Sequence, residues 1–178
     1  MRLKKGEKAP LFDVADVYGK RIALRDFAGK KLMVSFYRYS GCPLCNLRIA
    51  DLMEHYSEFE KQGLIMLSFW QSAKKEILET VSEQHAPFPL IPDKEKKIYT
   101  LYGVESRFVA ILKLLLHPAL SLRTLFSRFM KVKMAGDINL VPADFLINPD
   151  LTIHTAYYGK HIGDHLPISE IESFLAVD

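Results

Sequence analysis

Two nearly continuous apolar runs, at residues 32–37 and 64–70, constrain the fold of this chain more than any other feature. Runs this short and this apolar are typical of parallel strands that are buried on both faces of a sheet. Between the runs, four residues recur at the spacing of one helix face: Ile49, Leu52, Met53 and Tyr56. Gly63 follows, where such a helix would end. The pattern therefore predicts a βαβ unit and an α/β fold.

The alternation of helices and strands continues after the second apolar run. Apolar spacing predicts helices at about 77–81 and 98–102, with a short strand at 88–91 between them. The segment from about 105 to 138 breaks the alternation, because its apolar residues form two helical stripes of their own. We therefore expect a single domain over residues 1–178, with an inserted amphipathic helical pair at about 105–138.

The last part of the chain has the pattern of a hairpin followed by a helix. Residues 143–147 and 152–158 are strand-like, and Asn148-Pro149-Asp150-Leu151 between them is typical of a tight turn. A closing amphipathic helix follows Pro167. Parallel strands early in the chain and antiparallel strands late predict a mixed central sheet flanked by helices.

The charge of the chain is concentrated in one segment. The net charge is only +3, yet six basic and no acidic residues lie between Ser106 and Gly136: Arg107, Lys113, Arg123, Arg128, Lys131 and Lys133. Because the basicity is local and is not interleaved with aromatic residues elsewhere, we expect no nucleic-acid partner. The segment favours a lid or a homodimer contact, and docking on an acidic partner or a membrane surface is the alternative.

The N-terminus and the most apolar stretch both bear on location. Residues 1–8 are charged and have no apolar stretch behind them, so they are not typical of a secretory signal. Residues 108–126 are interrupted by basic residues and a proline, which a membrane-spanning helix rarely tolerates. We expect a cytoplasmic protein without a transmembrane span.

Both cysteines lie in Ser40-Gly41-Cys42-Pro43-Leu44-Cys45, between the first apolar run and the helix after it. Gly41 permits a sharp turn, Cys42 falls at the N-cap, and Pro43 fits the first helical position. The unpaired amides and the dipole of the helix favour a thiolate at Cys42, and Cys45, one turn on, can reach back to form a disulfide. The spacing predicts a redox-active dithiol, and two inert buried thiols are the alternative.

Arg38 lies on the strand side of the same turn. Its charge could stabilise a thiolate and orient a peroxide or a substrate disulfide, and a solvated arginine is the alternative. Tyr37 and Tyr39 flank it, and packing is the favoured role for both.

A metal site is not favoured by the residues present. Zinc would need two more ligands near the cysteine pair, and the chain has no third cysteine. His154, His161 and His165 are close in sequence, and we expect them in solvated loops. We expect no metal and no bound cofactor, so the Cys42–Cys45 pair itself would carry the electrons.

Seven further blocks of sequence follow one another in a familiar order: Gly6-Glu7-Lys8-Ala9-Pro10-Leu11-Phe12, Asp16-Val17-Tyr18-Gly19-Lys20, Leu24-Arg25-Asp26-Phe27-Ala28-Gly29-Lys30, Phe36-Tyr37, Phe88-Pro89-Leu90-Ile91-Pro92-Asp93, Tyr102-Gly103-Val104 and Phe145-Leu146-Ile147-Asn148-Pro149-Asp150. Together they span nearly the whole chain and resemble the peroxiredoxin-like members of the alkyl hydroperoxide reductase/thiol-specific antioxidant (AhpC/TSA) family. The resemblance implies a thioredoxin-like fold. It also implies an antioxidant oxidoreductase that an external thiol donor, such as a thioredoxin-like protein, would reset.

The active-site region departs from the pattern of that family, which has a proline, then threonine or serine, then a peroxidatic cysteine, and a later arginine. Counted from Phe36-Tyr37, Arg38 replaces the proline, Cys42 replaces the threonine and Cys45 takes the peroxidatic position. Counted from the turn, Cys42 is the attacking cysteine. Pro142 stands where the late arginine would be, and it resembles the cis-proline that faces the C-x-x-C of thioredoxins. An ordinary trans proline at a strand edge is the alternative.

The sequence thus predicts a dithiol oxidoreductase whose site comprises Cys42, Cys45, Arg38 and Pro142. Cys42 would attack a peroxide or a disulfide, and Cys45 would resolve the product to an internal disulfide. The cysteine pair and Pro142 favour a disulfide substrate, whereas the family resemblance and Arg38 favour a peroxide. A hypothesis of another class is a redox-regulated binding module that docks through residues 106–136.

Overall fold

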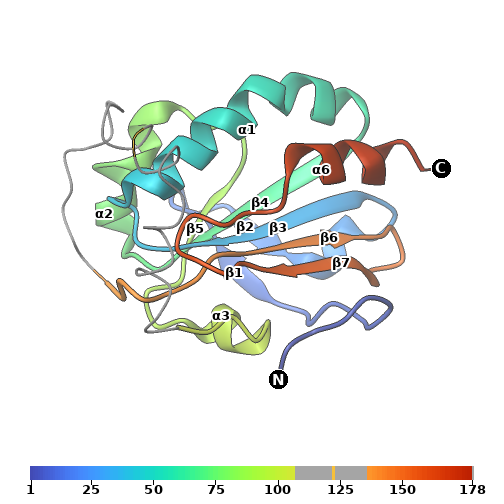
Figure 1. Ribbon diagram of the computed structural model, residues 1–178, viewed down its shortest axis with the longest axis horizontal. Helices are drawn as coiled ribbons and strands as arrows, with labels where there is room; N and C mark the ends of the chain where they lie inside the picture. Colours follow the sequence, from blue (N-terminus) through green and yellow to red (C-terminus); the bar gives the residue numbers. More distant parts are fainter. Residues whose placement is uncertain (107–121, 123–135, 178) are drawn as a thin grey trace.

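The computed structural model describes residues 1–106, 122 and 136–177 (Figure 1). The helical pair that we predict at about 105–138, with all six of its basic residues, therefore lies almost entirely outside the described residues. In the part that is described, no helix is both long and apolar enough to cross a bilayer.

A mixed five-stranded sheet forms the centre of the described structure, in the order β5-β4-β3-β6-β7. The central strand is β3 (Lys31–Tyr37), with β4 (Leu64–Trp70) parallel on one side and β6 (Ala143–Ile147) antiparallel on the other. The edges are β5 (Leu90–Pro92), parallel to β4, and β7 (Ile153–Tyr158), antiparallel to β6. The two buried parallel strands, the hairpin and the mixed sheet are all confirmed.

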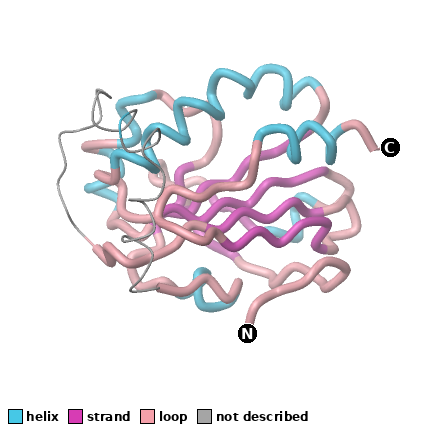
Figure 2. The backbone as a smooth tube through the Cα atoms, viewed as in Figure 1, coloured by secondary structure: helices cyan, strands magenta, loops and turns pink. Residues whose placement is uncertain are grey.

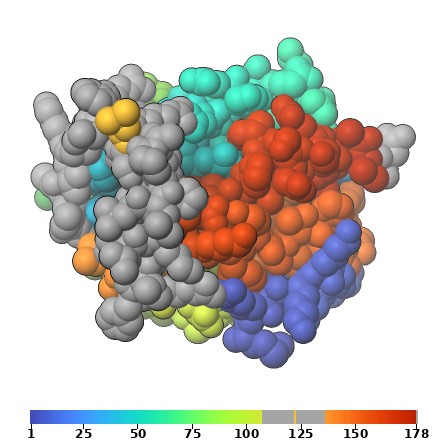
Figure 3. Space-filling view, viewed as in Figure 1, coloured from blue at the N-terminus to red at the C-terminus, as the bar shows by residue number. Residues whose placement is uncertain are grey.

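Helices cover both faces of this sheet. α1 (Pro43–Lys61) connects β3 to β4 as predicted, and α3 (Lys97–Leu101) lies over the opposite face with the N-terminal segment (Figure 2). α6 (Ile168–Leu175), the predicted closing helix, lies beside α1 on one face of the molecule (Figure 3). The chain therefore folds into three layers, with the sheet in the middle.

Short elements account for the differences from the sequence-based expectations. The helix expected at about 77–81 is instead α2 (Lys74–Leu78) followed by a separate 3-10 turn at Val81–Gln84. An additional small hairpin pairs β1 (Asp13–Ala15) with β2 (Arg21–Ala23), and a 3-10 turn at Leu24–Phe27 follows it. Strands of three residues are too short to produce a readable alternation, which is why the hairpin was not predicted.

The strand β3 is buried on both of its faces. Leu32 and Phe36 pack into the apolar layer on the α3 side, whereas Met33 and Tyr37 pack into the layer on the α1 side. Each of these four residues is fully buried. This double burial is the physical reason for the continuous apolar run in the sequence.

One row of polar residues crosses the α1 side of the sheet. Ser35 on β3 pairs in register with Ser68 on β4 and with Asp144 on β6. All three are at most 2% exposed. Burying an ionisable group at the centre of a sheet costs folding free energy unless the group has hydrogen-bond or charge partners. This row is therefore a candidate for a functional role.

The carboxyl ends of β3 and β4 meet at one edge of the sheet, where Tyr37 and Trp70 are paired in register. The rings of these two residues stack with centroids 4.6 Å apart, and both are fully buried. Beyond Tyr37 the chain enters the turn that carries both cysteines. Ligands of α/β folds commonly bind at such strand ends.

Candidate active site

The N-terminus of α1 has the geometry that the sequence predicts. Cys42 is the N-cap with an extended backbone (φ −72°, ψ 118°), and Pro43 occupies the first helical turn. The amide of Cys42 donates to the carbonyl of Tyr39 at 2.9 Å, which closes the turn that follows β3. Inside the helix, the amides of Leu44 and Cys45 donate to the Cys42 sulfur. The Cys42 sulfur therefore lies at the positive end of the helix dipole.

Arg38 contacts the same sulfur from the strand side. Its Nη1 donates to Cys42 Sγ at 3.1 Å, and its Nη2 donates to the carbonyl oxygen of Ile138 at 2.5 Å. Its guanidinium lies 5.2 Å from the ring centroid of Tyr39. Arg38 is only 4% exposed, so the alternative of a solvated arginine is wrong. A buried guanidinium held in this way is a fixed positive charge beside a thiol.

The two cysteines are free thiols, both fully buried, and their environments separate their protonation states. Burial alone would raise the pKa of Cys42, but the hydrogen bond from the Cys45 thiol, the charge of Arg38 and the helix amides lower it to about 6. Burial, together with donation to the neighbouring Cys42, raises the pKa of Cys45 well above its usual value. At neutral pH the geometry favours a Cys42 thiolate that accepts a hydrogen bond from a Cys45 thiol.

Polar side chains hold the cysteine turn in place. The Asn46 amide donates to the carbonyls of Ser40 and Cys42 at 2.7 and 2.9 Å, and it accepts from Gln84 at 2.6 Å. The amide of Ser40 donates to the hydroxyl of Ser72 at 3.0 Å. None of these positioning residues was predicted from the sequence. The available signal was Asn46, a polar residue one position after Cys45 on a helix that must bury its first turn.

The chain that returns at Gly136 packs directly against this turn. Gly136 has φ +124°, and a Cβ at that position would lie 3.2 Å from the Cβ of Tyr39. Gln71 links the two segments. Its backbone amide donates to the carbonyl of Arg38 at 3.2 Å, and its side-chain Oε1 accepts from the backbone amide of Asp137 at 3.1 Å. Residues 136–138 therefore form one wall beside Arg38.

Pro142 lies at the same end of the sheet, but not in the predicted form. It precedes Ala143, which pairs with Phe36, so it reaches the strand end that leads to the cysteine turn. None of the described peptide bonds is cis, so the bond between Val141 and Pro142 is trans and the resemblance to a cis-proline is wrong. The carbonyl of Pro142 accepts from the amide of Gly159 at 3.0 Å. The proline thus continues the β6–β7 pairing, as an edge proline does.

The histidines differ from expectation as well. His161 is buried, the His165 side chain is only 5% exposed, and His154 lies on β7, so none of the three is in a solvated loop. His165 Nδ1 lies 3.0 Å from Asp144 Oδ2. Among residues 1–106, 122 and 136–177, no group of three histidine, cysteine or acidic residues gathers as a metal-binding set. Asp144 was not singled out from the sequence, although an acidic residue inside the apolar run 143–147 was a usable signal.

Comparison with known protein families gives a match over most of the chain. The profile of the AhpC/TSA family matches residues 5–156. Peroxiredoxin Bcp of Escherichia coli K12 is 26% identical over 102 residues, and a protein of Mycobacterium tuberculosis that is named as a peroxiredoxin is 28% identical over the same length. Each match covers 57% of this chain and 65% of the relative, so the chain spans just under two thirds of the length of these relatives.

Solved structures share the fold at low sequence identity. Peroxidoxin BcpB of Mycobacterium tuberculosis superposes with a TM-score of 0.69 over 98% of this chain and 96% of that one, at 14% identity. The thioredoxin domain of a thiol-disulfide oxidoreductase from Bacteroides vulgatus gives a TM-score of 0.58 over 97% of this chain and 99% of that one, at 18% identity. The predicted thioredoxin-like fold is thereby confirmed.

Proposed function

The chain belongs to the AhpC/TSA family, and from this premise we propose that it is a thiol-dependent peroxidase in which Cys42 attacks the peroxide and Cys45 resolves the product. The single observation that carries the proposal is the 3.1 Å hydrogen bond from Arg38 to the Cys42 sulfur. It gives the thiolate of Cys42 a fixed cation at the end of β3.

The reaction follows from these groups. The Cys42 thiolate attacks one oxygen of the hydroperoxide, an S–O bond forms, the O–O bond breaks, and the leaving alkoxide or hydroxide takes up a proton. The sulfenic acid on Cys42 then condenses with the Cys45 thiol, which releases water and forms the Cys42–Cys45 disulfide. An external thiol donor, such as a thioredoxin-like protein, reduces this disulfide and restores both thiols. No bound cofactor is needed for these steps.

Arg38 explains how the site can work without the residues of the usual family pattern. Pro142 stands where the family has its late arginine, so that cation is missing from its usual position. Arg38, which stands in place of the family's proline, donates to the Cys42 sulfur from the strand side of the turn and supplies a positive charge there. We therefore assign to Arg38 the stabilisation of the thiolate and of the negative charge that develops on the peroxide oxygens.

The order of attack follows from the pKa values. The gap-free count from Phe36-Tyr37 would make Cys45 the attacking residue, but burial and its donation to Cys42 raise the pKa of Cys45. The pKa of Cys42 is lowered to about 6 by its partners. Only a thiolate attacks at a useful rate, so the geometry supports Cys42 first and Cys45 second.

A disulfide substrate is the second candidate, because C-x-x-C at a helix N-terminus also suits thiol–disulfide exchange. Two observations weigh against it. The Val141–Pro142 bond is trans, and the amide of Val141 already donates to the carbonyl of Glu105 at 3.3 Å, so this amide is not free to pair with a substrate strand. The hypothesis of a binding module depends on residues 106–136, most of which are not described, and no comparison supports it.

The test is the reaction of the fully reduced protein with hydrogen peroxide and, separately, with a small disulfide. Trp70 stacks on Tyr37 at the end of β3, so its fluorescence should report oxidation at the site in a stopped-flow instrument. We expect fast peroxide oxidation, an intact mass lower by two hydrogens, and no reaction in Cys42→Ser. Slow reaction with peroxide together with fast exchange with the disulfide would overturn the peroxidase proposal in favour of a disulfide reductase.

A further inference from the structure

A buried acid–histidine pair lies behind the cysteines, under α1. Asp144 is fully buried on β6, and its Oδ2 lies 3.0 Å from His165 Nδ1 and accepts from the amide of Leu166 at 2.8 Å. The His165 side chain is 5% exposed. Burial alone would raise the pKa of Asp144, but His165 and the nearby Arg48 lower it to about 2, so this carboxylate is charged at neutral pH.

The pair orients the imidazole of His165. Because an ionised carboxylate only accepts hydrogen bonds, Nδ1 of His165 must carry its hydrogen, and in the neutral ring Nε2 is then a free acceptor. Nε2 is buried and has no hydrogen-bond partner among the described residues. A histidine whose Nδ1 donates to a carboxylate and whose Nε2 has no protein partner within the described residues is arranged to take up a proton at Nε2.

Other unpaired polar atoms lie on the elements next to His165. Seven buried side-chain atoms lack a hydrogen-bond partner within the described residues, and five of them belong to β3, α1, β6 and the loop before α6: Ser35 Oγ, Tyr37 Oη, Arg48 Nε, Asp144 Oδ1 and His165 Nε2. Buried polar groups in folded proteins nearly always have a partner, either a protein group or an ordered water. Asp144, Arg48 and Ser35 all act on the pKa of the Tyr37 hydroxyl, and His165 contacts Asp144, so these groups point to one small hydrated space between β3, β6, α1 and the loop before α6.

This space has a route to solvent. A cavity of about 170 Å³ lies between the first turns of α1 and the loop before α6, and its lining includes Leu44, Arg48, Asp164 and His165. A cavity with this volume and several polar groups can hold water. Protons can therefore pass between solvent and His165 through ordered water without crossing the apolar layer.

The same space adjoins Cys45. Cys45 lies three residues before Arg48 on α1, which places the two on neighbouring turns of one helix face. The hydroxyl of Tyr37 is close enough to Cys45 and to Asp144 for both charges to act on it. Burial and these two charges raise the pKa of Tyr37, and the charge of Arg48 lowers it. The ring of Tyr37 also packs against that of His165 with centroids 5.2 Å apart.

We propose that Asp144 and His165 are positioning residues that accept the proton of the Cys45 thiol when Cys45 resolves the oxidised Cys42. The inference deepens the proposed function and rests on it. The proton moves from Cys45 to His165 Nε2 through the Tyr37 hydroxyl or a bridging water. The electron pair of Cys45 then attacks the Cys42 sulfur, the S–O bond breaks, and the departing hydroxide takes up a proton to leave as water. His165 returns its proton to solvent through the cavity.

The reason for such a device is the environment of Cys45. It is fully buried, and burial by itself disfavours its thiolate even after Cys42 has been oxidised, so Cys45 cannot resolve quickly unless a group nearby accepts its proton. Other ionisable groups near the pair are Arg48 and Asp51 on α1, Tyr157 on β7 and Asp164 in the loop. A guanidinium has no acceptor atom, and burial and the hydrogen bond to Asp164 raise the pKa of Tyr157, so neither side chain takes the proton of Cys45.

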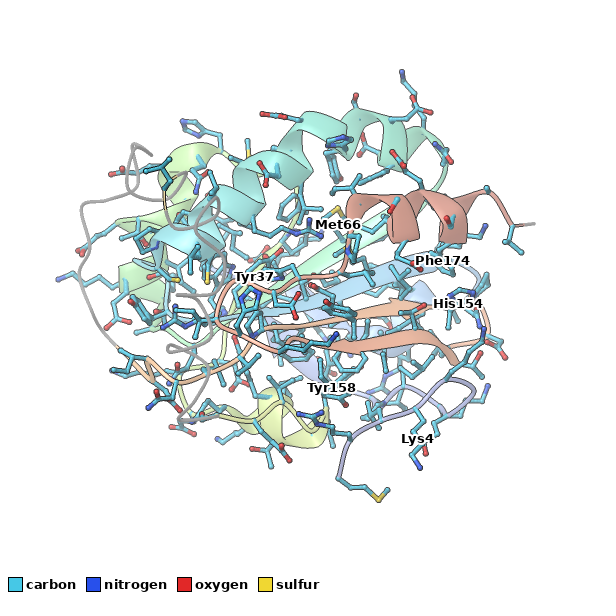
Figure 4. The ribbon with its side chains drawn as sticks, in the orientation of Figure 1. Lys4, Tyr37, Met66, His154, Tyr158 and Phe174 are labelled. Atoms are coloured by element: carbon cyan, nitrogen blue, oxygen red, sulfur yellow. The ribbon has the colours of Figure 1, made fainter. Side chains whose placement is uncertain are left out.

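The test uses His165→Gln, whose amide can still donate to Asp144 but cannot hold the proton. Reduced protein is mixed with hydrogen peroxide over a range of pH, and the sulfenic acid and disulfide steps are separated by intact mass after quenching. The matched control is His154→Gln, because His154 lies at the opposite end of the sheet, where its ring packs on that of Phe174 with centroids 4.8 Å apart (Figure 4). The double variant Asp144→Asn/His165→Gln removes the buried charge as well, and it serves if the single variant folds poorly.

We expect the first step to remain within about twofold of wild type and the disulfide step of His165→Gln to slow by about 100-fold near pH 7. The deficit should shrink at high pH, where hydroxide deprotonates Cys45 directly, and His154→Gln should match wild type in both steps. A disulfide step at the wild-type rate and with the wild-type pH profile would overturn the proposal, and so would equal slowing of both steps.

The outcome is separable from that of the proposed function. If the wild-type protein does not react with peroxide, the peroxidase proposal fails, but Cys45 must still resolve the mixed disulfide that a small aromatic disulfide forms on Cys42. The same variants are then compared in that step. Slow resolution in His165→Gln alone supports the proton-accepting pair, and equal rates overturn it.

Discussion

Replacing Arg38 with methionine tests the electrostatic account of the site most directly. Methionine keeps an apolar stem but removes the guanidinium that lies 3.1 Å from the Cys42 sulfur. A hydrogen bond to a charged group contributes about 1.5–3 kcal/mol, and one pKa unit corresponds to about 1.4 kcal/mol. The pKa of Cys42 should therefore rise by about one to two units in Arg38→Met.

The expected effect on rate depends on pH. From a pKa of about 6, such a rise lowers the thiolate fraction of Cys42 at pH 7 from about nine tenths to between about a half and a tenth. The rate of peroxide attack at pH 7 should then fall about two- to tenfold from ionisation alone. Near pH 9 both proteins are largely ionised. Any deficit that persists there measures the contribution of Arg38 to the charge that develops on the peroxide.

The assay is the pH dependence of Cys42 alkylation, located by peptide mass, together with peroxide kinetics on the same samples. Arg25→Met is the matched control, because the Arg25 side chain is 65% exposed and pairs with Asp13 on the surface at 3.6 Å. It should leave both the alkylation profile and the rate unchanged. If Arg38→Met leaves the pKa of Cys42 within a few tenths of wild type, Arg38 does not stabilise the thiolate and the reasoning is refuted.

Three further outcomes are expected. Cys45→Ser should still consume one equivalent of peroxide but accumulate the Cys42 sulfenic acid, which a carbon nucleophile traps; steady turnover at the wild-type rate without that intermediate would contradict the assignment of Cys45. Pro142→Ala should change the rate of peroxide reduction by less than about twofold, because a trans proline whose carbonyl is paired offers substrate no backbone; a loss beyond about tenfold would show that Pro142 has a direct role. The lowered pKa of Asp144 means that its contribution to stability is complete above the unfolded value of 3.8 and is lost as pH falls towards about 2. The free energy of unfolding of wild type, measured with denaturant, should therefore fall by about 2 kcal/mol more than that of Asp144→Asn over that pH window. Parallel plots of unfolding free energy against pH would count against a charged, paired Asp144.

Features set by neighbouring residues could be predicted from the sequence. The apolar runs at 32–37 and 64–70 became β3 and β4, and the position of Cys42 as the N-cap with Pro43 after it was correct. These features depend on interactions within about one helical turn or one strand, where burial on two faces and helix capping act directly on the local pattern.

Features that depend on distant partners were missed or mistaken. His165 was expected in a solvated loop, but its partner Asp144 lies 21 residues earlier on a central strand. Pro142 was compared with a cis-proline because it has the right place along the sheet, yet the hydrogen bond to Gly159 keeps it in a regular hairpin edge. No local pattern reports such pairings, since they arise only when the sheet register brings the strands together.

The active site itself contains both locally determined features and features that depend on distant partners. Arg38, Cys42 and Cys45 lie within eight consecutive residues, so a strand end, a tight turn and a helix N-terminus are enough to bring their reactive groups together. The burial of Arg38, its hydrogen bond to Ile138 one hundred residues away and the Asp144–His165 pair beneath α1 exist only because the sheet places β6 beside β3. Local chain geometry therefore determines which cysteine can be a thiolate, and long-range packing determines how strongly that thiolate is stabilised and which group can take the proton of its partner.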